Sequence, residues 1–134
     1  MITYYNIRQL ADLLNLNYDF LWKYLKKEME EDKSQNIRMV LNKYHVEDFI
    51  NAHLYPPGEK IDINMLLSHA DGSVWSMNEV FEYLKENDLP MHYTTLWRKV
   101  NKNEVTVIKI NKAFRFPIYK VKTEIQTGKY KKKY

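Results

Sequence analysis

The hydrophobic pattern of the chain is clearest in residues 76–100, where two stretches with helical spacing flank a break. The first stretch is predicted to begin at Ser76, because a serine followed three residues later by Glu79 forms a capping box. It ends before Pro90, since proline cannot continue an α-helix and disfavours helical geometry in the residue before it. The second stretch predicts a helix over residues 93–101. Two helices joined by a sharp turn are therefore expected here.

A β-hairpin is predicted after this helix pair. Residues 105–119 alternate apolar and polar side chains around Asn111-Lys112, as the two strands of a hairpin do. Pro117 favours an edge position for the second strand, because proline has no N–H to donate. A helix over residues 61–70 and a short strand at Val74-Trp75 are expected before the helix pair. Helix, turn, helix and hairpin is the order of a winged helix-turn-helix.

The N-terminal half repeats this order in a shorter form. Asn6 followed by Gln9 is a weaker capping box, and Asn15-Leu16-Asn17 predicts a turn because asparagine tolerates left-handed geometry. The charged residues 28–32 are expected to form the solvated end of a helix. The predicted elements are helices over residues 6–14 and 18–29, strands over residues 37–40 and 44–46, and a helix over residues 47–54.

Two units joined by a linker are expected. Pro56-Pro57-Gly58 is the clearest boundary, because paired prolines prefer extended geometry and the glycine ends it. Leu21-Trp22 and Leu96-Trp97 hold matching places in the second helix of each half, so the halves are interpreted as tandem copies of one fold. The predicted division is residues 1–55 for the first unit, 56–60 for the linker, 61–125 for the second unit and 126–134 for a basic tail without fixed structure.

Charge is distributed unevenly along the chain. The net charge is only +4, but residues 91–134 carry 12 basic and 2 acidic residues, whereas residues 1–70 carry 8 and 10 and residues 71–90 carry 1 and 5. The positive charge begins inside the second helix pair, at Arg98 and Lys99, well before the tail. This distribution favours a polyanionic partner, most simply nucleic acid.

Other classes of function find no support in the sequence. With 134 residues, 45% of them hydrophobic, the chain can bury a core, and the absence of cysteine excludes disulfides and thiolate metal sites. The four histidines stand far apart, and no glycine-rich phosphate loop or catalytic motif is present. There is no apolar run of about 18 residues and no signal pattern. We therefore expect a soluble, cytoplasmic, non-enzymatic protein without a metal, a cofactor or a membrane partner.

Residues 6–54 resemble the small winged-helix fold of phage excisionases and of the MerR-type DNA-binding domain. The likeness lies in the segment IRMV-LNK-YHVEDFI, which has that family's strand, turn, strand and helix start in order. Residues 62–121 are similar, with INKAFRFPIYKV in the place of the wing, and their additional first helix and strand resemble the winged helix of bacterial transcription regulators. The resemblance implies a mainly α fold with small β-hairpin wings (α+β), arranged as two tandem winged helix-turn-helix units that bind double-stranded DNA.

In a helix-turn-helix the second helix enters the major groove, and a wing meets phosphates or the minor groove. We expect such contacts from the polar face of each second helix and from the basic side chains of each wing. Trp97 and its counterpart Trp22 are expected to serve mainly in packing, each at the root of a wing. The predicted DNA-binding residues are Thr94, Trp97, Arg98, Asn101 and Lys102 in the second helix of unit 2, Lys109, Lys112 and Arg115 in its wing, Lys23, Lys26 and Lys27 in the second helix of unit 1, and Arg38 and Lys43 in the first wing.

The expected function is that of a small transcription regulator or an excisionase-like architectural factor of a phage, a plasmid or another mobile element. Because the first unit is net acidic, it is an alternative site for homodimer or partner contacts. Two other functions stay open at this point. One is a protein-interaction adaptor that keeps the fold without binding nucleic acid. The other is an RNA or single-strand binder that stacks bases on exposed tyrosines.

Overall fold

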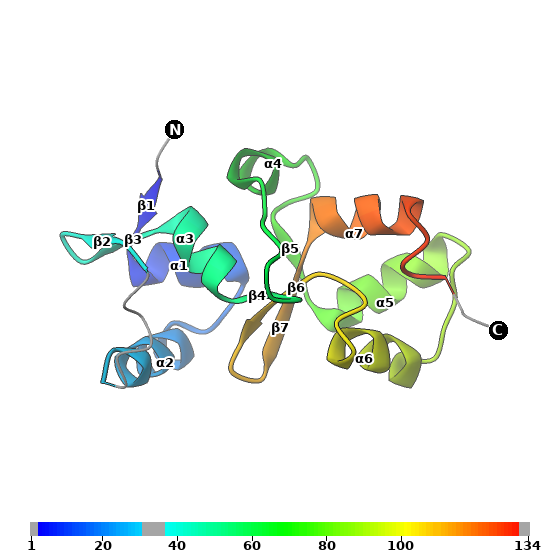
Figure 1. Ribbon diagram of the computed structural model, residues 1–134, viewed down its shortest axis with the longest axis horizontal. Coiled ribbons are helices and arrows are strands. Elements are labelled where there is room, and N and C mark those ends of the chain that lie inside the picture. Colours follow the sequence, from blue (N-terminus) through cyan, green and yellow to red (C-terminus); the bar gives the residue numbers. More distant parts are fainter. Residues whose placement is uncertain (1–2, 31–36, 132–134) are drawn as a thin grey trace.

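The computed structural model describes residues 3–30 and 37–131, which form helices and two small antiparallel sheets, an α+β architecture (Figure 1). The first elements in order are β1 (Tyr4–Tyr5), α1 (Ile7–Leu14), α2 (Tyr18–Glu30), β2 (Met39–Val40), β3 (Lys43–His45) and α3 (Val46–Ala52). They are followed by β4 (Leu54–Tyr55), α4 (Ile63–Ser68), β5 (Val74–Trp75), α5 (Met77–Glu86), α6 (Tyr93–Asn101), β6 (Val107–Ile110), β7 (Ala113–Pro117) and α7 (Ile118–Gln126). Residues 31 and 32 of the predicted charged helix end lie outside the described residues.

The two capping boxes predicted from the sequence are confirmed. The Asn6 side chain accepts a hydrogen bond from the backbone N–H of Gln9 at 2.8 Å, and the Gln9 side chain accepts from Asn6 at 2.9 Å. Ser76 and Glu79 make the same reciprocal pair at the start of α5. These caps satisfy N–H groups that have no partner inside the helix. None of the helices in the described part is both long and apolar enough to cross a membrane.

The first sheet has the strand order β1-β3-β2 and the second has the order β4-β6-β7-β5. Since β7 is flanked on both sides, the predicted edge position for Pro117 is wrong. Pro117 is nevertheless the last residue of β7, opposite Val74, and the next N–H, that of Ile118, donates to the carbonyl of Ser73 at 3.0 Å. A strand end therefore accommodates a proline that the middle of an interior strand would not.

The strand β4 joins the two halves of the chain. The sequence predicts that a helix continues to residue 54, but α3 ends at Ala52 and Leu54 pairs with Ile108 of β6. One hydrophobic core, called the first core, includes residues from before and after the proline segment. Its members include Leu10, Leu14, Leu21, Leu25, Phe49 and Ile50 together with Ile63, Leu66, Ile108, Ile110 and Tyr119. Residues 56–60 thus connect two halves that share a core.

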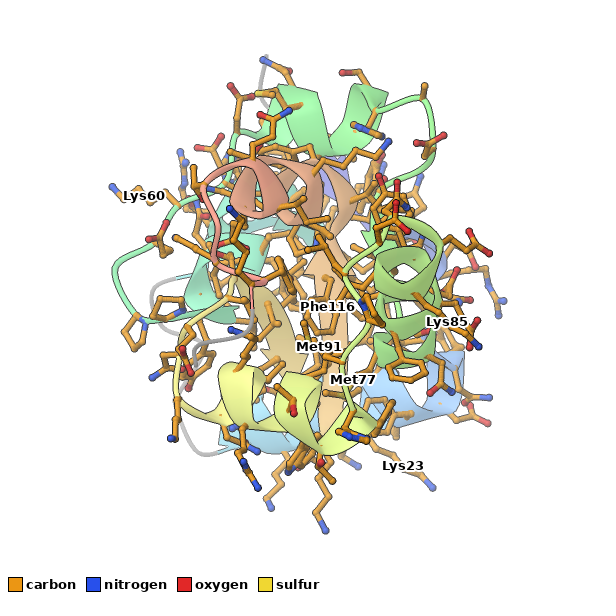
Figure 2. The ribbon with its side chains drawn as sticks, turned by 90° about the vertical axis from the view of Figure 1, so that its right-hand side faces the viewer. Lys23, Lys60, Met77, Lys85, Met91 and Phe116 are labelled. Carbon is orange, nitrogen blue, oxygen red and sulfur yellow. The ribbon has the colours of Figure 1, made fainter. Side chains whose placement is uncertain are left out.

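A second core fills the C-terminal half. Figure 2 shows Met77, Met91 and Phe116 gathered inside this half, and Phe116 is fully buried. Full burial of a side chain of this size contributes about 1.5–3 kcal/mol. The second core includes Met77, Val80, Leu84, Met91, Leu96, Val100, Val107, Phe116, Val121 and Tyr130.

The C-terminal segment is ordered through residue 131. The sequence predicts no fixed structure from residue 126 onward, but α7 extends to Gln126 and the next residues turn back onto the second core, where Tyr130 is 1% exposed. Lys99, which is buried, donates to the carbonyls of Lys129 and Lys131 at 3.0 and 3.2 Å. The prediction is wrong for residues 126–131, because it was based on the lysines and overlooked that Tyr130 could pack into the core. Residues 132–134 of the predicted tail lie outside the described residues.

Tyr130 provides a test of this packing. Its hydroxyl is buried and has no hydrogen-bond partner among the described residues. Tyr130→Phe should leave the free energy of unfolding unchanged or raise it, because a buried hydroxyl without a partner is costly. Tyr130→Ala should lower it by about 3–5 kcal/mol by opening a cavity. Urea unfolding of both variants measures the difference, and a clear loss in Tyr130→Phe would contradict the packing described.

Candidate nucleic-acid interface

Three elements lie along one edge of the molecule. Figure 1 shows α2, the turn of the β6–β7 hairpin and α6 along the lower edge, with the hairpin between the two helices. Figure 2, turned about the vertical axis, again shows Lys23 at the lower end, whereas Lys60 and Lys85 lie on other sides. We call α2, the β6–β7 hairpin and α6 the basic edge. Most of the DNA-binding residues predicted from the sequence lie on these three elements.

The sequence spacing of α6 separates a buried face from an exposed one. Leu96 and Val100 are 0% and 4% exposed, because residues four apart lie on the same side of a helix. The exposed side carries the polar residues that the sequence analysis predicts as an interface. These exposed residues are Thr94, Trp97, Arg98, Asn101 and Lys102. Lys99 is buried, unlike the other basic residues here, Arg98 and Lys102. This part of the chain therefore provides fewer surface charges than its composition indicates.

The helix α2 is arranged in the same way. Leu21 and Leu25 are buried in the first core, and the opposite side exposes Lys23, Lys26 and Lys27. The Lys26 ammonium lies 5.1 Å from the centre of the Trp22 ring, a cation–π distance. The chain therefore presents three cations from this helix, one of them stacked on an exposed tryptophan.

The β6–β7 hairpin is held to α6 by aromatic contacts. The rings of Trp97 and Phe114 meet edge to face with their centres 5.2 Å apart. The Lys109 ammonium lies 5.7 Å from the Phe114 ring and 5.3 Å from the Tyr55 ring, and Lys112 is exposed at the turn. Trp97 thus packs on Phe114 near the turn of the hairpin, rather than at the root of the wing, and remains 44% exposed. For Trp22, the structure shows the cation–π contact with Lys26.

Arg115 is occupied within the protein. Its Nε donates to the carbonyl of Leu14 at 2.8 Å, one Nη donates to Asn15 at 3.0 Å, and the other donates to Phe114 at 2.9 Å. Leu14 and Asn15 end α1, where the helix dipole places partial negative charge. Burial lowers the pKa of the Arg115 guanidinium from its ordinary value. Arg115 therefore connects the wing to the turn before α2, and we exclude it from the proposed contact surface.

The first hairpin lies apart from the basic edge. In Figure 1 the strands β2 and β3 are at the left end of the molecule. Arg38 is bound to Asp48 with an N–O distance of 2.5 Å, and this hydrogen bond lowers the pKa of the Asp48 carboxyl. Lys43 is exposed on β3. Of the predicted residues, Arg38 and Lys43 are thus the two that the fold does not bring to the basic edge.

A cleft of about 670 Å³ adjoins α2 and β6. Lys23, Lys27 and Lys109 are among its lining residues. The buried His53 and the half-buried Tyr24 also line it and form a pair: His53 Nδ1 lies 2.8 Å from the Phe49 carbonyl and Nε2 lies 2.9 Å from the Tyr24 hydroxyl. Since a carbonyl only accepts, Nδ1 carries the hydrogen and Tyr24 donates to Nε2.

Both groups of this pair are held neutral. Burial lowers the pKa of His53. Burial and the nearby Glu28 carboxylate raise the pKa of Tyr24. The sequence analysis missed the pair, because Tyr24 fits the apolar side of a helix and His53 follows it by 29 residues with no motif between them.

In comparisons with known proteins, no protein-family model, curated protein or solved structure matches the chain. In the described ranges, no three histidine or carboxylate side chains gather where they could hold a metal ion. The candidate interface therefore rests on the geometry and charge of the basic edge.

The buried histidine predicts a dependence of stability on pH. A pKa lowered by folding means that the unfolded state binds the proton more tightly. The contribution of the neutral His53 to the free energy of unfolding is therefore complete above the ordinary pKa of about 6.5 and is lost as the pH falls below it. Urea unfolding at about pH 7.5 and about pH 5.5 should show this loss in the wild type and a smaller one in His53→Gln.

His92→Gln is the control, because His92 is exposed and makes no side-chain cap bond to α6. It should lose as much stability at the lower pH as the wild type. An equal loss in His53→Gln would remove His53 as the source.

The role of Arg115 can be tested by a change that keeps the charge. Arg115→Lys should lower the free energy of unfolding by about 1–2 kcal/mol, because an ammonium cannot reproduce the planar fork that reaches three carbonyls. Lys112→Ala, at the exposed turn of the same hairpin, should change it by less than about 0.5 kcal/mol. Chemical denaturation measures both, and equal stability of Arg115→Lys and the wild type would contradict the assignment.

Proposed function

We propose that this chain is a double-stranded DNA-binding protein built from two tandem winged helix-turn-helix units. The observation that carries the proposal is the basic edge, where α2 and α6 flank a hairpin with an exposed lysine at its turn. Each of these helices is the second of a pair and buries one face, which leaves the other free for a ligand. A second helix free on its outer face, with a hairpin beside it, suits major-groove and backbone contacts.

The charge of this surface supports a polyanionic ligand. Among the described residues, Arg98, Lys102 and Lys112 make no ion pair, so their charges are available to a partner. Residues 105–123 contain no acidic residue, and Glu124 is buried, where it accepts hydrogen bonds from Thr106. DNA carries one negative charge per about 1.7 Å of helix axis, which such a row of cations can neutralise.

The residue types on α6 are suited to base recognition. The Arg98 guanidinium can pair with guanine through two hydrogen bonds, and the Asn101 amide can pair with adenine in the same way. Thr94 can meet a hydrogen-bonding base edge or a thymine methyl group. The lysines at positions 102, 109 and 112 would contact phosphates, which positions the protein without reading sequence. In biological terms, the proposal is a small transcription regulator or architectural factor of a phage, a plasmid or another mobile element.

A protein-interaction adaptor is the second candidate, and the first hairpin favours it. Leu41 at the turn of this hairpin is 89% exposed, and its neighbours Met39 and Val40 are 45% and 51% exposed. Three consecutive exposed apolar side chains are uncommon on a surface without a partner. This hairpin lies away from the basic edge, so both functions can coexist in one molecule.

The proposal predicts sequence-specific and salt-sensitive binding to duplex DNA. Selection from a random duplex pool should enrich a motif. Arg98→Ala should weaken binding to it by about 1–3 kcal/mol and relax one base position. Lys112→Ala should weaken binding about equally on all sequences and reduce the salt dependence by about one phosphate contact.

Lys85→Ala is the matched control, because it removes an exposed charge on α5 that lies away from the basic edge (Figure 2). It should leave affinity unchanged. Absence of binding to any duplex at low salt would overturn the proposal and put the adaptor first. Stronger binding to single strands than to duplex would also overturn the proposal and would favour a single-strand binder.

A further inference from the structure

We infer that α2 and α6 contact two segments of one DNA duplex at a single permitted separation, because the β6–β7 hairpin is wedged between the two halves of the protein and fixes them. This inference rests on the proposed function and adds a constraint on the partner. A tandem binder with a loose linker would accept two segments at many separations. The contacts of the β6–β7 hairpin hold this protein in one arrangement.

The backbone of the hairpin is bonded to the first half. Leu54 and Tyr55 of β4 pair with Ile108 and Val107 of β6, and the N–H of Lys109 donates to the carbonyl of His53 at 2.8 Å. These bonds continue the ladder of the second sheet into the end of the first half. Strand pairing of this kind sets both the position and the register of the two segments.

The side chains of β6 pack on both halves. Successive residues of a strand point to opposite faces, so Val107 enters the second core while Ile108 and Ile110 enter the first. The two isoleucines are fully buried. A close-packed core on each face leaves no room for the hairpin to slide relative to either half.

The side chains of β7 follow the same alternation. Phe114 and Phe116 pack on the second core, and Phe114 meets Trp97 of α6. Between them, Arg115 reaches the other way and bonds to Leu14 and Asn15. The hairpin is thereby joined directly to α6 on one side and to the turn that precedes α2 on the other.

It follows that α2 and α6 move as one body. A DNA segment bound by α2 then determines where α6 meets the same duplex. B-DNA turns once in about 10–10.5 base pairs, so a changed separation alters both the distance and the side of the duplex on which the second segment lies. Only one separation should allow both helices to bind.

The test begins with the motif selected for the wild type, which should contain two conserved blocks. An insertion of about five base pairs between the blocks, half a turn of B-DNA, should reduce affinity about tenfold or more. An insertion of about ten base pairs restores the side of the duplex but not the distance, and affinity should stay low. A flexible connection would recover affinity at the longer insertion, and that result would overturn the inference.

Variants identify which helix each block meets. Lys23→Ala in α2 should weaken binding to the original site. It should have no effect on DNA with the insertion, which α6 binds alone. Lys60→Ala, which removes an exposed lysine away from the basic edge, should affect neither DNA. A motif of one block, unaffected by Lys23→Ala, would overturn the inference and leave DNA binding by α6 in place. No binding to any duplex would overturn both the inference and the proposed function.

Discussion

The arrangement of this protein depends on a hairpin that packs against both halves of the chain. Ile108 and Ile110 complete the first core, while Val107 and Phe116 complete the second, so two strands serve as the boundary of two hydrophobic cores. The period of two along a strand makes this possible, because adjacent positions satisfy opposite neighbours. On this hairpin, Lys109 and the turn residues Asn111 and Lys112 remain exposed. The hairpin therefore determines both how the halves meet and which part of the wing a ligand can reach.

The position of the β6–β7 hairpin also determines which basic side chains are exposed. Arg115 and Arg98 are the same residue type on adjoining elements, but Arg115 faces the first half and bonds three carbonyls, whereas Arg98 is exposed on α6. Lys99 is turned inward by one helical step and holds the C-terminal turn. An arginine fork suits several carbonyl acceptors at a helix end. The surface charge that can attract DNA is thus smaller, and more localised, than the composition indicates.

One buried polar cluster in each half is paired by hydrogen bonds. Glu124 accepts from the N–H and hydroxyl of Thr106 and lies 3.3 Å from the Lys129 ammonium. His53 and Tyr24 remain neutral beside the cleft that adjoins α2. Glu124 is thus held beside the start of β6, and the Tyr24 hydroxyl connects the middle of α2 to His53.

The sequence by itself determined the local elements of this protein, because their signals act over a few residues. The capping residues Asn6 and Ser76 marked two helix starts, the spacing of Leu96 and Val100 marked the buried side of α6, and Asn111-Lys112 marked the hairpin turn. The exposed faces of α2 and α6 followed from the same periodicity. These features covered the α+β class and most residues of the candidate site.

Only the tertiary structure decided what those elements meet. The pairing of β4 with β6, the interior place of β7 and the anchoring of Tyr130 all join residues distant in the chain, and no local pattern encodes such contacts. The helix α7 was not predicted either, since the apolar alternation was expected to continue as a strand to residue 119. The alternation in β6 and β7 indicated two faces but not that both would be covered. Both faces are covered because a hydrophobic core forms on each side of the hairpin. As a result Arg115 bonds to the first half, whereas Arg98 on α6 stays exposed.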